Sequence, residues 1–379
     1  MLAPGAFLER SRAAGFRLWT GVPCSYLTSF IDGVIADPST WYVPAANEGD
    51  AVAIGAGARL GGLPSVVMMQ NSGLGNAVNP LSSLCETLRV PVLLIVTLRG
   101  DPNGPADEPQ HALMGRITTA LLDLLGTAWT WFPRDEQDIA PCLERAVAHM
   151  AATGLPYALV MKKGSVGAGP PSPPLPQHRP VPRTLPPDEA PRARRRDWLR
   201  AVHASARQDD LVVASTGYLG RELYALDDRA NQLYLVGSMG CASSVGLGIA
   251  LAQPTRRVIV LEGDGAGLMR LGAWSAIGYA RPANFRHLLI DNGCHDSTGG
   301  QSSLSGTVDF CALAAASGYA SVSRRAEPSA LGEWLDAPHD GPAFLHVPIL
   351  PGTPADLPRP KEAPPAVARR FAAQLGVSL

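Results

Sequence analysis

Residues 258–266 read VIVLEGDGA, a short apolar run that passes into two glycines around Asp264. An apolar run of this length without polar alternation predicts a strand that is buried on both faces, as in a parallel sheet covered by helices. A second run, HLLID at residues 287–291, ends immediately before Asn292. Because ligands bind beyond the carboxyl ends of parallel strands, we expect Asp264 and Asn292 at one ligand-binding edge of a sheet.

Short apolar runs alternate with helix-like stretches along most of the chain. The predicted strands are residues 17–20, 42–44, 65–69, 91–97, 129–132 and 157–161, followed by 211–215, 233–237, 258–262, 287–291, 320–323 and 343–348. The predicted helices include residues 48–60 and 137–152. This alternation is typical of parallel sheets, so the sequence predicts an α/β protein with two doubly wound parallel-sheet domains of similar size.

A proline-rich segment at residues 164–196 separates these two halves. It contains too few large apolar residues to bury a core, so we expect an extended, semi-stiff linker. The predicted domains are therefore residues 1–163 and 197–350. The remaining residues, 351–379, form a tail in which we expect one short helix.

The linker ends on a run of arginines at positions 192, 194, 195 and 196. A helix is expected to begin just after this run, near Asp197. Short charge runs of this kind are typical of solvated faces, so the sequence assigns these arginines no function.

Composition excludes several classes of protein. The chain carries 32 Lys and Arg against 33 Asp and Glu, a formal net charge of −1, so no overall basic field favours nucleic-acid binding. No apolar run approaches the roughly 18 residues that would span a membrane. The first twelve residues lack the pattern of an export signal, so we expect a cytoplasmic protein. The six cysteines include no C-x-x-C pair, which favours reduced thiols over a zinc ribbon or a disulfide framework.

The two strand ends supply hard oxygen ligands. A carboxylate at Asp264 and an amide at Asn292 suit Mg²⁺ holding a diphosphate. Gly263 and Gly265 would let the backbone approach a phosphate closely, and a helix opening at Ala266 would offer its N–H groups to the anion. Without Asn292 at the next strand end, the same residues would indicate only a glycine-rich turn.

The pattern Gly-Asp-Gly, 26 residues and then Asn resembles the diphosphate-binding signature of thiamine diphosphate enzymes. The resemblance implies a pyrimidine-binding domain and a diphosphate-binding domain, with Mg²⁺ held by Asp264, Asn292 and the backbone carbonyl of Cys294. It also implies a glutamate at the start of a helix in the pyrimidine domain, and Glu48 fits this position. Met239 stands where the superfamily places a bulky apolar residue against the bent cofactor.

Further motifs narrow the resemblance to the phosphonopyruvate decarboxylases, which lack the middle domain of larger relatives. The motifs are GVPCS (21–25), MMQNSGLGNAVNPLSSL (68–84), RGDPNGPADEPQHALMG (99–115), GSMGCASSVGLGIAL (237–251) and DNGCHDSTGGQ (291–301). Two residues depart from the pattern of this family. Cys241 stands in place of a histidine, and Cys294 stands in place of a small residue. These departures affect the expected local packing and not the expected reaction. The resemblance implies non-oxidative decarboxylation of 3-phosphonopyruvate to phosphonoacetaldehyde and CO₂, which suits the assembly of phosphonate natural products.

The resemblance also implies roles for individual residues. Glu48 would share a proton with the aminopyrimidine of the cofactor. His111, which follows Asp107 in the loop after strand 91–97, is the preferred proton shuttle because imidazole exchanges protons near neutral pH. His295 is the second candidate. Further expected cofactor contacts are Asn71, Asn76, Thr216, Gly217 and Ser238, and expected substrate contacts are Ser25, Arg99, Ser297, Thr298 and Gln301.

Parts of the sequence are also compatible with other functions. A nicotinamide enzyme is disfavoured because Gly73 and Gly75 are followed by Val78, where the dinucleotide pattern needs a third glycine. Sulfopyruvate decarboxylase is a close alternative, since sulfonate and phosphonate are both tetrahedral anions. A carboligase and a non-catalytic subunit of the same fold are less favoured. The resemblance further implies a dimer or tetramer whose active sites are shared between subunits and accept a small anionic 2-keto acid.

Overall fold

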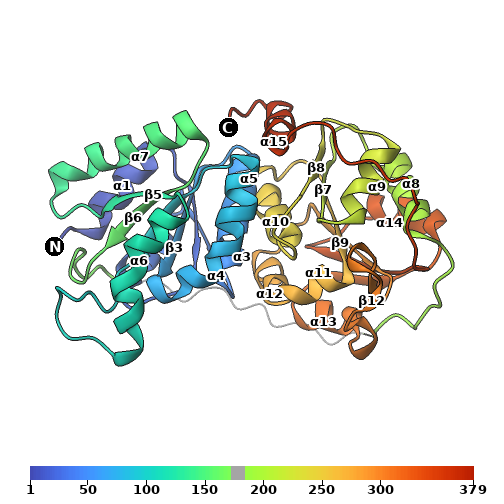
Figure 1. Cartoon of the computed structure of the whole chain (residues 1–379), viewed down its shortest axis with the longest axis horizontal. Helices are drawn as coiled ribbons and strands as arrows, with labels where there is room; N and C mark the ends of the chain where they lie inside the picture. Colours follow the sequence, from blue (N-terminus) through green and yellow to red (C-terminus); the bar gives the residue numbers. More distant parts are fainter. Residues whose placement is uncertain (172–183) are drawn as a thin grey trace. The chain divides into compact units, whose positions relative to one another are not determined.

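The computed structural model describes residues 1–171 and 184–379, and it divides the chain into two compact units (Figure 1). One unit runs from Met1 to Pro176 and the other from Gln177 to Ser378. The middle of the predicted linker, residues 172–183, lies outside the described residues. Among the described residues, no helix has the length and apolar character needed to cross a bilayer.

The first unit is built on a six-stranded parallel sheet with the strand order β2-β1-β3-β4-β6-β5. Its strands are β1 (Leu18–Gly21), β2 (Trp41–Pro44), β3 (Ser65–Gln70), β4 (Leu93–Thr97), β5 (Ala128–Trp131) and β6 (Tyr157–Met161). Its helices are α1 (Pro4–Ala13), α2 (Thr28–Ala36), α3 (Glu48–Leu60), α4 (Leu74–Pro80), α5 (Glu86–Leu88), α6 (Ala112–Leu124) and α7 (Ile139–Thr153). All six predicted strands are confirmed within two residues at each end.

Helices cover both faces of this sheet. On one face α1, α2 and α7 enclose an aromatic cluster, in which the ring of Phe7 lies 4.6 Å from that of Phe132. On the other face α3 packs directly on β3, because a Cβ at Gly55 would lie 2.8 Å from Cγ2 of Val67. Burial on both faces explains why the strands read as continuous apolar runs.

The second unit has the same architecture, with the strand order β13-β14-β10-β9-β7-β8 and all neighbours parallel. Its strands are β7 (Leu211–Ala214), β8 (Gln232–Tyr234), β9 (Val258–Gly263), β10 (Phe285–Asp291), β13 (Ser321–Arg324) and β14 (Ala343–Pro348). The predicted strands are again found, although β8 ends at Tyr234, three residues before the predicted end. A small antiparallel hairpin, β11 (Cys294–His295) with β12 (Gln301–Ser302), follows β10 and was not predicted.

Eight helices complete the described part of this unit. They are α8 (Arg195–Ser205), α9 (Tyr218–Leu226), α10 (Ala242–Ala252), α11 (Asp264–Met269), α12 (Gly272–Ala280), α13 (Phe310–Ala316), α14 (Leu331–Asp336) and α15 (Pro364–Ala373). The short helix expected in the tail is α15. On the face of the sheet that α10 and α12 cover, Trp274 packs against His287 and Phe344. The ring centroids lie 5.3 Å and 5.0 Å apart, respectively.

The start of α8 confirms one expectation and corrects another. The helix begins at Arg195, near Asp197 as expected, and Asp197 accepts a hydrogen bond from the Arg194 amide at 3.0 Å and so caps the first turn. Arg195 is only 7% exposed, so the expected solvated face is wrong at this residue. Arg192, Arg194 and Arg196 are exposed, as expected. The six cysteines, all within the described residues, are free thiols.

Candidate active site

The second unit places Asp264 and Asn292 at adjacent strand ends. The register of β9 and β10 pairs Gly263 with Ile290, so the turns that follow the two strands are neighbours. Asp264 opens α11, and Asn292 directly follows β10. Both side chains line one pocket, as expected for residues beyond the carboxyl edge of a parallel sheet.

Most of the residues predicted to bind the cofactor in this unit line the same pocket. They are Thr216, Gly217, Met239, Gly263, Gly265 and Ala266. The same pocket is lined by Cys294, His295 and Ser297, which were predicted as a metal ligand, a proton-shuttle candidate and a substrate contact. Ser238 is buried beside them but does not line the pocket. Thr298 and Gln301 are exposed on the hairpin and bond to each other at 2.9 Å.

Gly265 is the tightest point of this pocket. A Cβ at Gly265 would lie 2.5 Å from Cε1 of His295 and 3.3 Å from Cε of Met239. His295 and Met239 therefore pack directly over the turn that carries Asp264, and a larger residue at position 265 would displace their side chains.

The electrostatics around Asp264 fit a bound cation. Asp264 is 3% exposed, and the hydroxyl of Ser303 donates to its Oδ2. Burial raises the pKa of Asp264 above its usual value. No basic side chain in the described part of the chain forms an ion pair with this carboxylate. A buried carboxylate and an amide that line the same pocket are hard oxygen donors, which suit Mg²⁺.

The amide of Asn292 has a defined orientation. Its Nδ2 donates to Oδ2 of Asp296 at 2.8 Å and to Sγ of Cys294 at 3.3 Å. Both amide hydrogens are therefore held by protein groups, and Oδ1 is left as the end that a metal would bind. Asp296 was not predicted as a site residue.

The first unit brings Glu48 and Asn76 together. Glu48 opens α3, where the side chain of Asn47 caps the helix by accepting from the Gly49 amide at 2.8 Å. Asn76 donates from Nδ2 to Oε2 of Glu48 at 2.8 Å. The other oxygen, Oε1, lies against Gly73, where an added Cβ would be 2.0 Å away. Glu48 as a whole is 9% exposed, so its carboxyl group is confined between Asn76 and Gly73.

Asn71 holds two strand ends together. Its side chain is fully buried, its Oδ1 accepts from the Arg99 amide at 3.2 Å, and its Nδ2 donates to the Arg99 carbonyl at 2.9 Å and to Oγ1 of Thr118 at 3.0 Å. These contacts join the end of β3 to the end of β4. They anchor the loop that carries Asp107 and His111.

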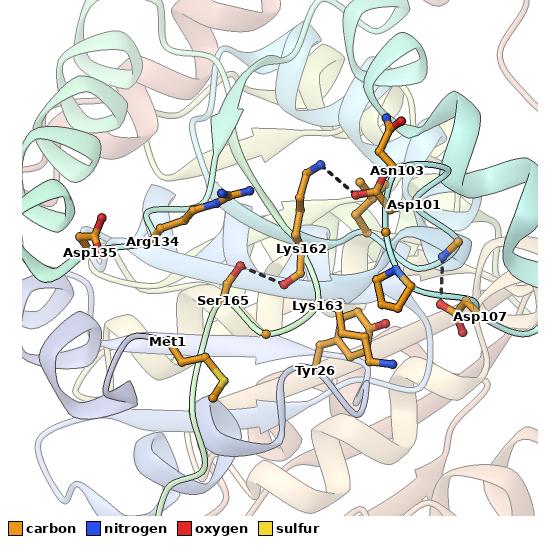
Figure 2. A pocket seen from close by; sticks show the side chains of 15 residues that line it. Met1, Tyr26, Asp101, Asn103, Asp107, Arg134, Asp135, Lys162, Lys163 and Ser165 are labelled. Atoms are coloured by element: carbon orange, nitrogen blue, oxygen red, sulfur yellow. Dashed lines mark hydrogen bonds and ion pairs between the residues drawn. The ribbon is translucent and has the colours of Figure 1, made fainter.

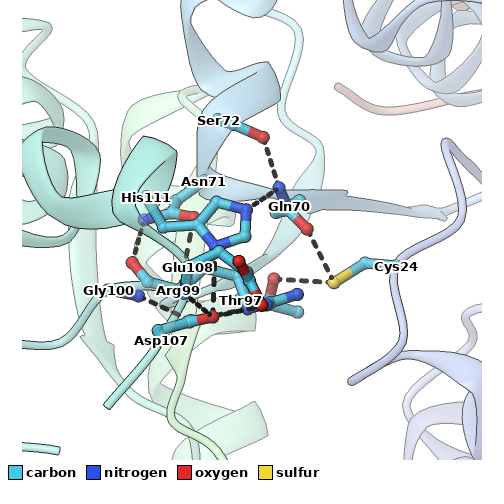
Figure 3. A network of polar contacts seen from close by, with 10 residues as sticks. All are labelled: Cys24, Gln70, Asn71, Ser72, Thr97, Arg99, Gly100, Asp107, Glu108 and His111. Carbon is cyan, nitrogen blue, oxygen red and sulfur yellow. Dashed lines mark hydrogen bonds and ion pairs between the residues drawn. The ribbon is translucent and has the colours of Figure 1, made fainter.

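His111 lies between an ionised carboxylate and an amide, as Figure 3 shows. Its Nδ1 is 3.2 Å from Oδ1 of Asp107, and its Nε2 is 3.3 Å from Nε2 of Gln70. The Arg99 guanidinium, which donates from Nε to Asp107 at 2.7 Å, holds the pKa of that carboxyl well below its usual range. Because Asp107 can only accept, Nδ1 carries the hydrogen, and Nε2 is the acceptor for Gln70.

Gln70 is a site residue that the sequence analysis missed. Its Oε1 accepts from the thiol of Cys24 at 3.3 Å, which turns its amino group toward His111 and toward Oγ of Ser72 at 2.6 Å. Cys24 is in turn 3.3 Å from Oγ1 of Thr97 (Figure 3). Gln70 is the last residue of β3, so the strand-end rule that selected Asp264 would also have selected it.

A second pocket lies beyond Asp107 at the ends of β4, β5 and β6, with a volume of about 430 Å³ (Figure 2). Lys162 reaches across it to Asp101 at 2.8 Å. Arg99 lies over the ring of Tyr26 at 5.0 Å and is held by Asp107, so its guanidinium is tied within the unit. Ser25, the other predicted substrate contact of this unit, is exposed and does not line this pocket.

Comparison with known proteins agrees with this geometry. The model of the thiamine pyrophosphate enzyme N-terminal TPP binding domain matches residues 5–119, and that of the C-terminal TPP binding domain matches residues 219–347. A phosphonopyruvate decarboxylase of Streptomyces viridochromogenes is 45% identical over 93% of this chain and 90% of its own length. The chain belongs to the phosphonopyruvate decarboxylase family of thiamine pyrophosphate enzymes. This confirms the family and the class of enzyme predicted from the sequence.

Two further relatives and one solved structure are also similar to this chain. A second phosphonopyruvate decarboxylase, from Streptomyces hygroscopicus, is 42% identical over 98% of this chain and 93% of its own length. A sulfopyruvate decarboxylase of Methanosarcina acetivorans is 28% identical over 78% of this chain and 76% of its own length. The crystal structure of a benzoylformate decarboxylase from Polynucleobacter necessarius superposes with a TM-score of 0.69 at 13% identity, over 92% of this chain and 98% of that one. At that identity the match confirms the fold alone.

Proposed function

We propose that this chain decarboxylates 3-phosphonopyruvate to phosphonoacetaldehyde and CO₂ with thiamine diphosphate and Mg²⁺. The observation that carries the proposal is 45% and 42% identity to two phosphonopyruvate decarboxylases over at least nine-tenths of every chain compared. The geometry supports it, because each unit holds the side chains that its half of such a site needs.

The second unit would hold the metal and the diphosphate. Asp264 supplies a charged oxygen, Asn292 an oriented amide oxygen and Cys294 its backbone carbonyl. The glycines on either side of Asp264 leave room for phosphate oxygens near the backbone. When bound, thiamine diphosphate supplies a thiazolium ring that accepts the electron pair left by departing CO₂.

In the first unit, Glu48 would hold and move the proton at the aminopyrimidine. Asn76 already donates to Oε2, so Oε1 is the oxygen left to carry that proton. Gly73 keeps this oxygen accessible, because any larger residue there would collide with it.

His111 would deliver the proton to the carbon that CO₂ leaves. Asp107 holds the hydrogen on Nδ1, so Nε2 is the atom that would gain and give up the proton once the hydrogen bond from Gln70 is released. Asp107 is thus a positioning residue, ionised and bound to Arg99, while His111 moves the proton.

The two candidate histidines can be separated by substitution. We expect His111→Gln to lower kcat by roughly 10²-fold, because general acid–base catalysis typically contributes that much or more. His295→Gln is the matched variant and should lower kcat by less than about tenfold, since its ring packs over Gly265 and a glutamine retains part of that contact. The measurement is steady-state CO₂ release at saturating cofactor. A larger loss in His295→Gln would transfer the proton role to that residue.

The substrate proposal is tested by competition between phosphonopyruvate and sulfopyruvate in one reaction. A phosphonate has a second ionisable oxygen that a sulfonate lacks, so above its second pKa it carries one more negative charge than a sulfonate. A charge-assisted hydrogen bond is worth about 1.5–3 kcal/mol, so phosphonopyruvate should be consumed faster by roughly ten- to a hundredfold. Preferential consumption of sulfopyruvate would replace the proposed substrate.

We further propose that the chain self-associates as a dimer or tetramer with active sites shared between subunits. Large exposed apolar side chains beside both half-sites support this proposal. Leu113 lies two residues after His111 and is 57% exposed, and Leu304 follows Ser303, which binds Asp264, and is 70% exposed. A subunit interface over either half-site would cover these side chains and remove their apolar surface from water.

Subunit mixing tests this assembly. Glu48→Gln and Asp264→Ala are each expected to inactivate the site they belong to. After dissociation and reassembly, a mixture of the two variants should regain activity, because each mixed dimer can form one intact site from the two unaltered halves. Sedimentation analysis of the same mixture shows which species is active. Mixtures that exchange subunits and stay inactive, or an active monomer, would contradict shared sites.

A further inference from the structure

Asp296 contacts two of the three residues that would bind the metal. Its Oδ2 accepts from Nδ2 of Asn292 at 2.8 Å, and its Oδ1 accepts from the thiol of Cys294 at 3.3 Å. Asn292 would offer its side-chain oxygen to the cation, and Cys294 its backbone carbonyl. One carboxylate therefore sets the orientation of two ligand-bearing residues.

Asp296 is itself held by Arg195. Both terminal nitrogens of Arg195 lie 3.3 Å from Oδ2 of Asp296, and its Nε donates to Oε1 of Glu222 at 2.8 Å. Its Nη2 also donates to Oγ1 of Thr353 at 2.9 Å and to the Gly352 carbonyl at 3.3 Å. Arg195 thus joins the start of α8, helix α9, the loop after β10 and the tail.

This network is more than a surface ion pair. The side chains of Arg195, Glu222 and Asp296 are 8%, 2% and 13% exposed. Burying charges costs free energy that their mutual attraction offsets only in part, so such a network adds little net stability. Instead, the network fixes the orientation of the groups that it contacts, here the amide of Asn292.

We propose that Arg195 and Asp296 are positioning residues for the metal site. Asp296 holds the amino group of Asn292 and so turns the amide oxygen toward the cation, while Arg195 keeps the Asp296 carboxylate in place. This inference rests on the proposed binding of Mg²⁺ with thiamine diphosphate. Neither residue is assigned to the substrate or to a chemical step.

The test is calorimetric titration of Mg²⁺ into the metal-free full-length chain at saturating thiamine diphosphate. Asp296→Ala removes the acceptor for Asn292 and should weaken Mg²⁺ binding by about ten- to a hundredfold, as for other residues that orient metal ligands. Asp296→Asn keeps an acceptor oxygen and should retain most of the affinity. Arg195→Met, which contacts Asn292 only through Asp296, should also weaken Mg²⁺ binding.

A matched control separates positioning from stability. Arg257 and Asp210 form another buried ion pair of this unit, at 2.6 Å and with side chains 9% and 2% exposed. Asp210→Asn should lower the melting temperature without changing Mg²⁺ affinity. Melting curves of every variant report whether it is folded.

The outcomes separate this inference from the proposed metal site. If Asp296→Asn loses as much affinity as Asp296→Ala, the acceptor oxygen of residue 296 does not position Asn292 and this role is wrong. Unchanged Mg²⁺ affinity in Asp296→Ala and Arg195→Met, or an equal loss in Asp210→Asn, would also overturn it while leaving the metal site intact. If the wild-type chain binds no Mg²⁺, the metal site itself falls, and this inference falls with it.

Discussion

A chain carrying Glu48→Gln is expected to bind thiamine diphosphate and to turn over roughly 10²–10⁴ times more slowly than the wild type. Glutamine keeps the shape of the side chain and one oxygen, but it cannot hold and release a proton. Asn76, which donates to Oε2, can still donate to an amide oxygen, so the local packing should survive. The measurement is kcat at saturating cofactor, with cofactor retention measured after gel filtration.

Asp50 offers the control for this variant. It is the other acidic residue in the first turn of α3, and it is buried. Asp50→Asn should change the stability of the helix start without an equivalent loss of rate. A Glu48→Gln chain with a rate near that of the wild type would show that this glutamate is not the proton carrier.

The second large effect is expected from Asp264→Ala, which should abolish cofactor retention. The carboxylate is buried without a basic partner in the described structure, and its charge is the one formal charge in the proposed donor set. Removing it leaves a neutral amide and a carbonyl, which are weak ligands for Mg²⁺ on their own. The measurement is the thiamine diphosphate that remains bound after desalting in the presence of Mg²⁺.

Removing the metal from the wild-type protein tests the same prediction in a second, independent way. Treatment with EDTA should inactivate the enzyme, and added Mg²⁺ should restore activity. Full activity in EDTA, with no residual metal in the protein, would exclude the proposed role of Asp264.

The sequence predicted the fold well because these strands are buried on both faces. β4 and β9, for example, lie in the middle of their sheets and read as unbroken apolar runs, which distinguishes them from the helices around them. The hairpin of β11 and β12 escaped prediction because strands of two residues are too short to show a period.

The candidate site was predicted where it depends on strand ends and missed where it depends on tertiary contacts. Asp264 and Asn292 follow neighbouring strands, so their proximity follows from the order of the sheet. Arg195 resembles a solvated residue in a charge run, and it is buried because Glu222 and Asp296, the latter 101 residues away, surround its guanidinium. The residues around Arg195 in the sequence carry no pattern that indicates a partner so far along the chain.

The most direct test of the account is to follow phosphonopyruvate by ³¹P NMR in the presence of the purified chain, thiamine diphosphate and Mg²⁺. We expect the phosphonopyruvate signal to be replaced by that of phosphonoacetaldehyde, with one CO₂ released for each molecule consumed and no reaction in the Glu48→Gln chain on the same timescale. An unchanged phosphonopyruvate signal under conditions in which the same preparation decarboxylates sulfopyruvate or pyruvate would contradict the proposed function.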